Sequence, residues 1–449
     1  MRHGALAAAV AALAVSAAGI FADRAQPGMR VLQLAPGTVE VHSEMVLHPN
    51  TEVRGAAGGT TLRMAADFQG RAVFVVNGGN VRLHDFAIEG NRLALEVRAG
   101  LPPSNVPFAR FTRNNGILAD GADRLTIERV TFRAIAGFAI LVSTSREIAI
   151  DRVRVSDSGS RNSRGRNNST GGILLEEGTS DFRVTRCELT RIRGNGIWTH
   201  SLFTSPRNAR GWMALNRFSD LARDAIQVGH ATAVRVEDNS GERIGYPVEE
   251  VDAENQAVPV ALDTAGDVDA TSYARNEFRE VDGKCVDLDG FHDGEVVENQ
   301  CLNQANPDLY PFGNVGILFN DSNPHTRSKN IRVVGNVLDG VKYTGIFAFG
   351  TGHTIANNRL LNLNLAHCNE EAARYGCYEP AGEPDALASG IYLGKGVLWP
   401  EPSRGIRVVD NEITGFKMKT RCIQRAPGVQ AGANVVEGNV CRDATSSLP

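Results

Sequence analysis

The sequence predicts an all-β solenoid, in which short strands coil around one axis and each coil stacks on the previous one. Two short phrases recur along the chain and carry this prediction. In the first, an Asn precedes a short apolar strand, and in the second, a Gly-Ile pair opens one. Asn276 and Asn299 stand 23 positions apart, and Asn336 and Asn358 stand 22 apart. A period in the low twenties with short strands and little helical pattern is typical of such a solenoid.

The Asn phrase marks turns of the expected coils. Asn suits these turns because its amide bonds neighbouring groups and because it tolerates left-handed backbone geometry. Identical turns that stack coil on coil form ladders of side chains. The phrase occurs at Asn216, Asn276, Asn299, Asn336, Asn358, Asn411 and Asn439.

The Gly-Ile phrase marks one strand of each expected coil. Successive side chains of a strand point to opposite faces, so the Ile and the residue two positions later are expected to fill the interior. The side chains between and after them then face outward. The phrase begins at Gly116, Gly172, Gly196, Gly316, Gly345 and Gly390.

These repeats resemble those of the right-handed parallel β-helix proteins of the pectate-lyase-like superfamily. The opening Leu34-Ala-Pro-Gly37 phrase and the later Pro49-to-Gly55 phrase are also similar to the first coil of such a helix. The resemblance covers roughly residues 30 to 445. It implies a single-stranded right-handed parallel β-helix with inserted loops. Enzymes, adhesins and phage tailspikes share this architecture, so the fold alone does not assign a function.

Composition agrees with one long domain over residues 26 to 449. Of the 449 residues, 42% are hydrophobic and 22% are charged, and the formal net charge is −4. This charge does not favour nucleic acid or an acidic lipid surface as a partner. No linker rich in Pro and Ser interrupts the repeats, and a solenoid grows without a thicker core. The oligomeric state stays open at this point.

The first 25 residues are predicted to be a secretory signal peptide. A short basic start at Arg2 and His3 precedes a run rich in Ala, Leu and Val from Ala5 to about Phe21. Small residues near the end of the run complete the pattern. An uncleaved membrane anchor is the alternative. No later segment is apolar enough to span a membrane, so we expect a periplasmic or secreted protein without a span after signal removal.

Seven cysteines fit that compartment. Cys368 and Cys377 bracket a short polar loop and are expected to be joined. Two more pairs are expected from their separation of about one coil, namely Cys285 with Cys301 and Cys422 with Cys441. Cys187 would then remain unpaired. The alternative is that most of these residues are buried thiols that act as small hydrophobes.

Acidic residues occupy outward positions on two expected coils. Read in order, these positions give Ala261 and Asp263 on one coil and Asp287 and Asp289 on the next. Adjacent coils lie about 4.8 Å apart, and residues two apart on a strand lie about 6.6 Å apart. We therefore expect Asp263 and Asp289 to be near neighbours across coils, with Asp287 slightly farther from Asp289.

Three carboxylates this close cannot all ionise, so at least one should have a raised pKa. A carboxylic acid beside a carboxylate is what glycoside hydrolysis requires. The sequence therefore predicts that Asp263, Asp287 and Asp289 cleave glycosidic bonds, and the spacing along the strand suits an inverting reaction. His292, just after the acidic strand, is expected to share the catalytic role. The alternative is that these acids are solvated surface residues.

The acidic arrangement is similar to that of polygalacturonase-type hydrolases, in which one Asp on a coil and two on the next surround the scissile bond. This resemblance implies that Asp263 matches the single residue and that Asp287 and Asp289 match the pair. Three phrases of that family are absent, namely Asp-Asp, Gly-His-Gly and Arg-Ile-Lys. The similarity therefore assigns neither the sugar nor the mechanism.

A polysaccharide or oligosaccharide is the expected partner, because aromatic faces bind sugar rings and polar groups fix their orientation. Inserted loops, among them residues 98 to 114, 157 to 171 and 364 to 388, are expected to wall the binding surface. The predicted substrate-binding residues lie on either side of the acids. They are Trp198, His200, His230, Asn320, Phe347 and Tyr392.

Two alternatives remain. In the first, the three Asp residues hold calcium and the protein is a lyase of a uronic-acid polymer, with Lys284 or Lys342 as the base. No other cofactor is expected. In the second, the protein is a non-catalytic surface or adhesin solenoid.

Overall fold

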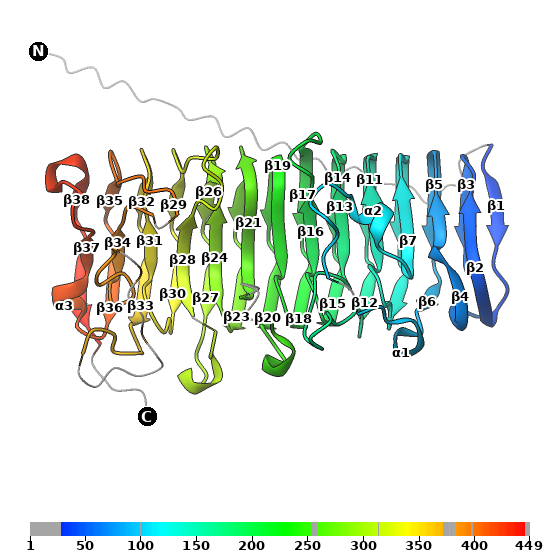
Figure 1. The fold of residues 1–449 in the computed structure, drawn as a ribbon, viewed down its shortest axis with the longest axis horizontal. Coiled ribbons are helices and arrows are strands. Elements are labelled where there is room, and N and C mark those ends of the chain that lie inside the picture. Colours follow the sequence, from blue (N-terminus) through cyan, green and yellow to red (C-terminus); the bar gives the residue numbers. More distant parts are fainter. Residues whose placement is uncertain are drawn as a thin grey trace, which may run out of the picture.

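Strands of this chain stack as parallel coils along one straight axis, from the blue N-terminal end to the red C-terminal end in Figure 1. The structure is a computed structural model that describes residues 28–98, 100–252, 258–312, 314–370, 377, 380, 382–396 and 398–444. The predicted parallel β-helix is confirmed, and the predicted signal peptide lies outside the described residues. Within the described part, no helix has the length and apolar character needed to cross a membrane.

Parallel pairing arranges the strands in three rows. The first row carries the Gly-Ile phrases. It contains β7 (Asn115–Asp120), β10 (Ile140–Ser143), β13 (Ile173–Glu176), β16 (Ile197–His200), β19 (Ile226–Glu237), β21 (Val260–Asp269), β24 (Lys284–Asp289), β28 (Val315–Asn320), β31 (Ile346–Ala348), β34 (Ile391–Leu393) and β37 (Ile423–Arg425). At the N-terminal end, β2 (Gly37–Leu47) and β4 (Thr60–Val76) are long enough to run from the third row into the first.

The second row follows each first-row strand after a turn. It contains β1 (Arg30–Gln33), β3 (Thr51–Arg54), β5 (Gly79–His84), β8 (Asp123–Glu128), β11 (Arg146–Asp151), β14 (Ser180–Thr185), β17 (Asn208–Ala214), the later part of β19, β22 (Ser272–Ala274), β26 (Glu295–Val297), β29 (Arg332–Val334), β32 (Thr354–Ala356), β35 (Arg407–Val409) and β38 (Val435–Glu437). The short β25 (Phe291–His292) pairs with the end of β21 in the turn before β26.

The third row closes each coil. It contains β6 (Ala87–Glu89), β9 (Thr131–Arg133), β12 (Arg154–Ser156), β15 (Glu188–Ile192), β18 (Arg217–Leu221), β20 (Ser240–Ile244), β23 (Glu277–Val281), β27 (Gln300–Leu302), β30 (Val337–Asp339), β33 (Arg359–Leu363), β36 (Glu412–Gly415) and β39 (Val440–Asp443). Short helices lie in the connections: α1 (Arg92–Leu95), α2 (Phe108–Phe111), α3 (Met418–Arg421), η1 (Val248–Glu250), η3 (Pro307–Leu309) and η4 (Ala431–Ala433).

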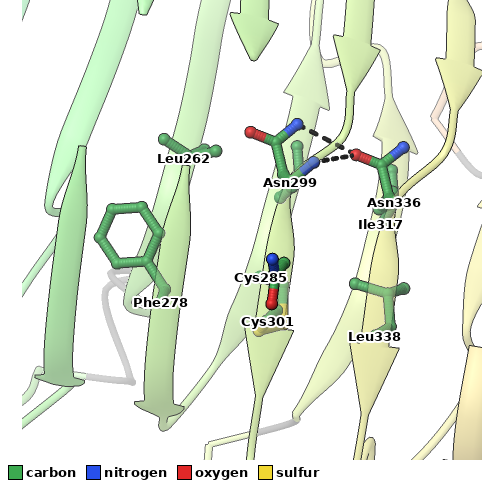
Figure 2. Close-up of a pocket in the computed structure, with 10 residues that line it drawn as sticks. Leu262, Phe278, Cys285, Asn299, Cys301, Ile317, Asn336 and Leu338 are labelled. Carbon is green, nitrogen blue, oxygen red and sulfur yellow. Dashed lines mark hydrogen bonds between the residues drawn. A yellow bond between two sulfur atoms is a disulfide. The ribbon is translucent and has the colours of Figure 1, made fainter. Parts of the chain in front are cut away.

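An asparagine ladder joins consecutive coils in the buried turn between the second and third rows. Asn299 shows the pattern (Figure 2). Its backbone N–H and its Nδ2 donate to Oδ1 of Asn336 over 2.9 and 3.0 Å, and Nδ2 also donates to the carbonyl of Tyr273 over 2.9 Å. Burial of an amide is costly unless its groups are bonded, and the ladder satisfies them. The same contacts connect Asn216, Asn239, Asn276, Asn299, Asn336, Asn358, Asn411 and Asn439.

The three predicted disulfides are confirmed, joining Cys285 to Cys301, Cys368 to Cys377 and Cys422 to Cys441, and Cys187 is a buried free thiol. The interior beside Cys285 holds a gap of only about 10 Å³ (Figure 2). A gap of this size has room for about one water molecule, so it is a packing defect of the core and not a binding site.

Cys285 and Cys422 stand at the position that Gly occupies in the Gly-Ile phrase, directly before an inward first-row residue. Gly is needed there on other coils because a Cβ on Gly316 would lie 2.1 Å from the carbonyl oxygen of Gly345 and 2.6 Å from Cδ1 of Leu338 in the third row. Leu338 is the direct partner of Cys301. The disulfide therefore fills the space that a Gly and a Leu share on the next coil.

We expect the double substitution C285G/C301L to be tolerated better than C285S/C301S. Either pair removes a cross-link across a short loop, which costs about 2–4 kcal/mol. The Gly and Leu pair restores the contact seen in the next coil, whereas two Ser residues would bury hydroxyl groups, so a difference of about 1–2 kcal/mol is expected. Thermal unfolding of the three proteins under non-reducing conditions measures it. A lower melting temperature for C285G/C301L would contradict the Gly-position explanation.

Inserted segments cover both ends of the outward face of the first row. At the N-terminal end, Phe108 and Ala109 of α2 pack on Leu141, Leu174 and other outward residues. At the C-terminal end, the segment after β33 contributes Ala366, Cys368 and Leu387 to a second outer cluster. The coils of β19, β21 and β24 lie between these two covers.

Candidate functional site

Asp263 and Asp287 face each other on neighbouring coils. They are direct Cα partners in the pairing of β21 with β24, and each residue is only 6% exposed. The expectation that Asp263 would neighbour Asp289 is wrong. Leu262, and not Val260, aligns with the inward Ile226 of the preceding coil, so the strand is shifted by two residues from the predicted register.

Lys284 binds the Asp287 carboxylate. Its ammonium forms a close ion pair with Oδ2 of Asp287 from the start of the same strand, and 22% of the Lys284 side chain is exposed. The buried Asp263 and Asp287 pair is therefore connected to the surface through the Lys284 side chain. Oδ1 of Asp287 is buried and has no hydrogen-bond partner among the described residues.

Two amides hold the Asp263 carboxyl from the other side. Gln227 Nε2 donates to Oδ2 of Asp263 over 2.5 Å, and Asn195 Nδ2 donates to Oε1 of Gln227 over 2.8 Å. Asn195, Gln227, Asp263 and Asp287 thus form a polar row across four coils. Asn195 and Gln227 were not among the predicted site residues, because a neutral amide is common on such strands.

Asp224 is a third buried carboxyl of this site that sequence reasoning missed. It is 3% exposed, accepts the backbone N–H of Val260 over 3.0 Å, and lies 3.7 Å from Nε of Arg223. Its position in the sequence was the available signal. Asp224 directly precedes Ala225-Ile226, which replaces the Gly-Ile phrase on this coil, so its carboxyl lies beside the first row.

Burial and mutual repulsion raise the pKa values of these carboxyls. Burial shifts the pKa of Asp263 well above its usual range, and the charges of Asp224 and Asp287 add to the shift. Burial also raises the pKa of Asp287, and the neighbouring Lys284 ammonium opposes this shift. Burial raises the pKa of Asp224 to about 6. The pKa values of both Asp263 and Asp287 are therefore raised, and the ion pair with Lys284 limits the rise at Asp287.

Lys284 stays charged in this environment. Burial lowers the pKa of its ammonium, but attraction to Asp287 and to the two other carboxyls outweighs the burial, and the net shift is upward. The cluster thus combines an ammonium, the Asp287 carboxyl that forms an ion pair with it, and the buried Asp263 carboxyl, whose pKa is raised. This combination can donate a proton to one atom and stabilise positive charge at another.

Asp289 lies two positions beyond Asp287, and its carboxylate binds the loop after β28. The backbone N–H of Ser322 donates to Oδ1 over 2.6 Å, and the Ser322 hydroxyl donates to Oδ2 over 2.5 Å. Asn320, the direct partner of Asp289, accepts the N–H of Asp321 over 3.0 Å with its side-chain oxygen. Both side chains therefore order this loop.

His292 lies in the turn that follows β24. Its Nδ1 is 2.8 Å from Oδ2 of Asp293, and its Nε2 is 3.1 Å from Oδ1 of Asp267. These two carboxylates hold the ring from both sides. The catalytic role expected for His292 stays a prediction.

The outward aromatic residues are buried rather than exposed to solvent. Trp198 is 8% exposed and packs edge-on against Phe108 with ring centroids 5.0 Å apart, whereas Tyr392 is fully buried. Phe347 stacks on Tyr392 with centroids 5.6 Å apart and planes 12° apart. The expectation of exposed aromatic faces is therefore wrong for these residues, because the inserted segments close over them. A substrate contact for Trp198, Phe347 and Tyr392 is not proposed.

His200 and His230 lie together beyond Trp198. The rings of His200 and Trp198 are 5.1 Å apart, and His230 sits in a left-handed turn with φ 46° against Phe203, whose ring is 4.9 Å away. Burial lowers the pKa of His200 to about 4 and also lowers the pKa of His230. Both imidazoles are therefore neutral at neutral pH.

A cavity of about 290 Å³ lies between two of the predicted loop insertions, near the starts of β7, β10 and β13. Apolar side chains form one wall, and the insertion at residues 157 to 171 forms the other. Its lining includes Leu95, Val97, Leu101, Phe111, Asn114, Ser160 and Thr170. This cavity lies on the N-terminal side of Asp263 and Asp287, and neither residue lines it.

Comparison with known proteins supports the fold and its hand. A family model described as a right-handed beta helix region matches residues 71–257. No curated protein matches the chain. The chain has a right-handed parallel β-helix fold, as the sequence predicted.

Three solved structures illustrate the breadth of this similarity. PfbA, a surface adhesin of Streptococcus pneumoniae, has a TM-score of 0.57 and 14% identity over 76% of this chain and 86% of its own. The Dettilon tailspike protein has a TM-score of 0.53 and 14% identity over 90% of this chain and 63% of its own. A mutant of the periplasmic alginate epimerase AlgG has a TM-score of 0.51 and 11% identity over 91% and 83%. Identities this low establish the fold alone.

Proposed function

We propose that this protein is an exported enzyme that cleaves glycosidic bonds of a polysaccharide or oligosaccharide, with Asp263 as the proton donor and Asp287 as its carboxylate partner. One observation carries the proposal: the two residues are direct partners on neighbouring coils, and Asp287 forms an ion pair with the Lys284 ammonium. Glycoside hydrolysis requires one carboxyl that holds a proton and one that is ionised. The three disulfides are consistent with export.

In this mechanism Asp263 protonates the oxygen of the leaving sugar. Gln227 fixes its carboxyl by donating to Oδ2 and leaves Oδ1 to carry the proton. Asp287, whose ionised form is stabilised by the ion pair with Lys284, attacks the anomeric carbon or activates water. Asp289 and His292 stay in the proposal as flanking residues that position the sugar.

The spacing of the pair changes the expected stereochemistry. The backbones of paired residues on neighbouring coils lie about 4.8 Å apart, and their side chains project side by side. This is close to the roughly 5–5.5 Å between the carboxyls of retaining enzymes and below the separation used by inverting ones. We therefore infer a retaining reaction in place of the inverting one expected from Asp287 and Asp289. NMR of the first anomer released checks this inference, and an inverted product would contradict it.

Calcium-assisted elimination is less well supported by the same residues. A lyase base must give up its proton, whereas the carboxylates around Lys284 raise its pKa. The Lys284 ammonium also provides the positive charge that a calcium ion would bring to Asp287. Lys342 donates to the carbonyl of Tyr310 over 2.6 Å and lies in the turn before β31.

The test is an assay on a panel of neutral and acidic polysaccharides. New reducing ends without ultraviolet absorption from unsaturated uronides, unaffected by a chelator, are the expected result. The double variant D263N/D287N provides the blank. Unsaturated products that disappear with the chelator would overturn hydrolysis in favour of elimination. Sugar binding without cleavage, equal in both proteins, would instead indicate a non-catalytic adhesin.

A further inference from the structure

A second cluster of carboxylates and imidazoles lies on the first row, apart from the Asp263 and Asp287 pair. Glu176 ends β13, Glu177 follows it, and His200 ends β16. Glu176 and His200 are direct partners on neighbouring coils, and the N–H of Glu177 donates to the carbonyl of His200 over 3.1 Å. One potential ligand atom from each of the three side chains lies within 4.8 Å of the other two. The pairing of the coils thus converges three metal-ligating groups on one point.

Surrounding donors hold both carboxylates in place. Glu176 accepts the backbone N–H groups of Phe108 and Ala109 over 2.9 and 2.7 Å. Glu177 accepts the N–H of Leu202 over 2.9 Å and also accepts the Ser205 hydroxyl. A carboxylate oxygen has two lone pairs, so each group keeps acceptor capacity for an ion. Donors of this kind fix the orientation of metal ligands in proteins.

The cluster lacks the cation that its burial requires. Glu176 is fully buried and Glu177 is 6% exposed. Among the described residues, no Lys or Arg forms an ion pair with either glutamate, in contrast to Asp287 with its Lys284. Buried carboxylates are costly unless a charge or a metal compensates them.

Two imidazole nitrogens in this part of the first row also lack a hydrogen-bond partner among the described residues. Nδ1 of His200 and Nδ1 of His230 are buried without a hydrogen-bond partner in the described part of the chain. His230 is 8% exposed. An unsatisfied ring nitrogen in a buried site is the feature expected of a metal ligand.

We propose that Glu176, Glu177 and His200 bind a divalent transition-metal ion such as Zn²⁺. Imidazole with carboxylate is a ligand set that Zn²⁺ and its first-row neighbours prefer, whereas Ca²⁺ prefers oxygen ligands alone. The ion would compensate both buried carboxylates and use the unpartnered nitrogen. This inference does not depend on the glycosidic activity.

The experiment uses the full chain freed of metal with a chelator and then dialysed. Zn²⁺ affinity and stoichiometry are measured by competition with a chromogenic indicator, and Co²⁺ provides an absorption spectrum of the bound ion. H200Q and E177Q remove one ligand each and are compared by circular dichroism with the parent. H42Q is the matched control, because His42 also lies 2.8 Å from a carboxylate, Asp67, but both side chains are more than half exposed at 60% and 74%.

One Zn²⁺ ion per chain is expected, with affinity reduced at least about 100-fold in H200Q and in E177Q and unchanged in H42Q. Zn²⁺ should also raise the melting temperature of the parent, because a ligand that binds only the folded state stabilises it. If one ligand variant fails to fold, the other carries the comparison. Absence of stoichiometric binding, equal affinity in a folded ligand variant, or binding of Ca²⁺ alone would overturn the proposal.

Discussion

Replacement of Asp263 by Asn is expected to lower the rate of glycosidic cleavage about 10²–10⁴-fold, the range that general acid catalysis contributes. Asn is nearly the same size and still accepts from Gln227, so the loss would reflect the missing proton. Asp287→Asn is expected to reduce the rate at least as much, because the carboxylate that meets the anomeric carbon is removed. Initial rates on the most active polysaccharide of the panel measure both effects.

The pH profile distinguishes the two roles. Burial and the neighbouring carboxyls raise the pKa of Asp263, so the proton donor is present at low pH and is lost as the pH rises through that value. The parent should therefore lose activity on the alkaline side, and D263N should lack this limb. Asp287 must be ionised, so activity of the parent should also fall as the pH drops through its pKa.

A substrate with a good leaving group provides a further control. An aryl glycoside needs little protonation of its leaving oxygen, so D263N should lose much less activity on it than on the polysaccharide. D120N is the matched control, since Asp120 ends a first-row strand away from the cluster and accepts the Thr144 hydroxyl over 2.7 Å. Full activity of both D263N and D287N would refute the proposed site. An equal loss of D263N on both substrates would refute Asp263 as the acid.

Replacement of Asn299 by Ala is expected to destabilise the fold by about 3–5 kcal/mol. The side chain loses its donations to Tyr273 and Asn336, and its Oδ1 no longer accepts the two N–H groups of Asn276 over 3.0 and 2.8 Å. Each buried donor or acceptor left without a partner costs about 1–3 kcal/mol, and a small cavity adds to this cost.

Thermal unfolding measures the loss of stability, and hydrogen exchange locates it. Faster exchange is expected first in the coils of β22, β26 and β29, because each coil of a solenoid depends on its neighbours. N330A is the control, since the Asn330 side chain lies outside the ladder and donates to the surface carboxylate of Asp293 over 2.8 Å. A change below about 1 kcal/mol in N299A would show that the ladder does not hold the coils together.

The repeats and cross-links of this fold follow from local sequence. The Gly-Ile phrase placed its Ile residues inside, since alternation along a strand fixes which face is apolar. The spacing of Cys285 and Cys301 allowed a disulfide, and the structure joins them across β24 and β27, which are facing strands of one coil. The inward Ile residues and the possible cysteine pairs depend on residues near each other in the chain, so the sequence pattern indicates them directly.

The neighbours of Asp263 did not follow from the same reasoning. Alternation has a period of two, so Val260 and Leu262 both satisfy an inward position, and a shift by two residues keeps every side chain on its correct face. The shift nevertheless changes the residue on the next coil from Asp289 to Asp287. Only the paired backbone resolves this choice.

The sequence by itself determined that this protein is a β-helix whose first row carries an acidic centre. Buried strands and turns need particular residue types, and these recur with the period of the coil. Only the tertiary structure decided which carboxyls share that centre, that Lys284 forms an ion pair with Asp287, that loops bury Tyr392, and that Glu176, Glu177 and His200 converge. The reason is that the separation of a side chain from residues on other coils depends on loop lengths and strand register. No repeating sequence pattern encodes either of them.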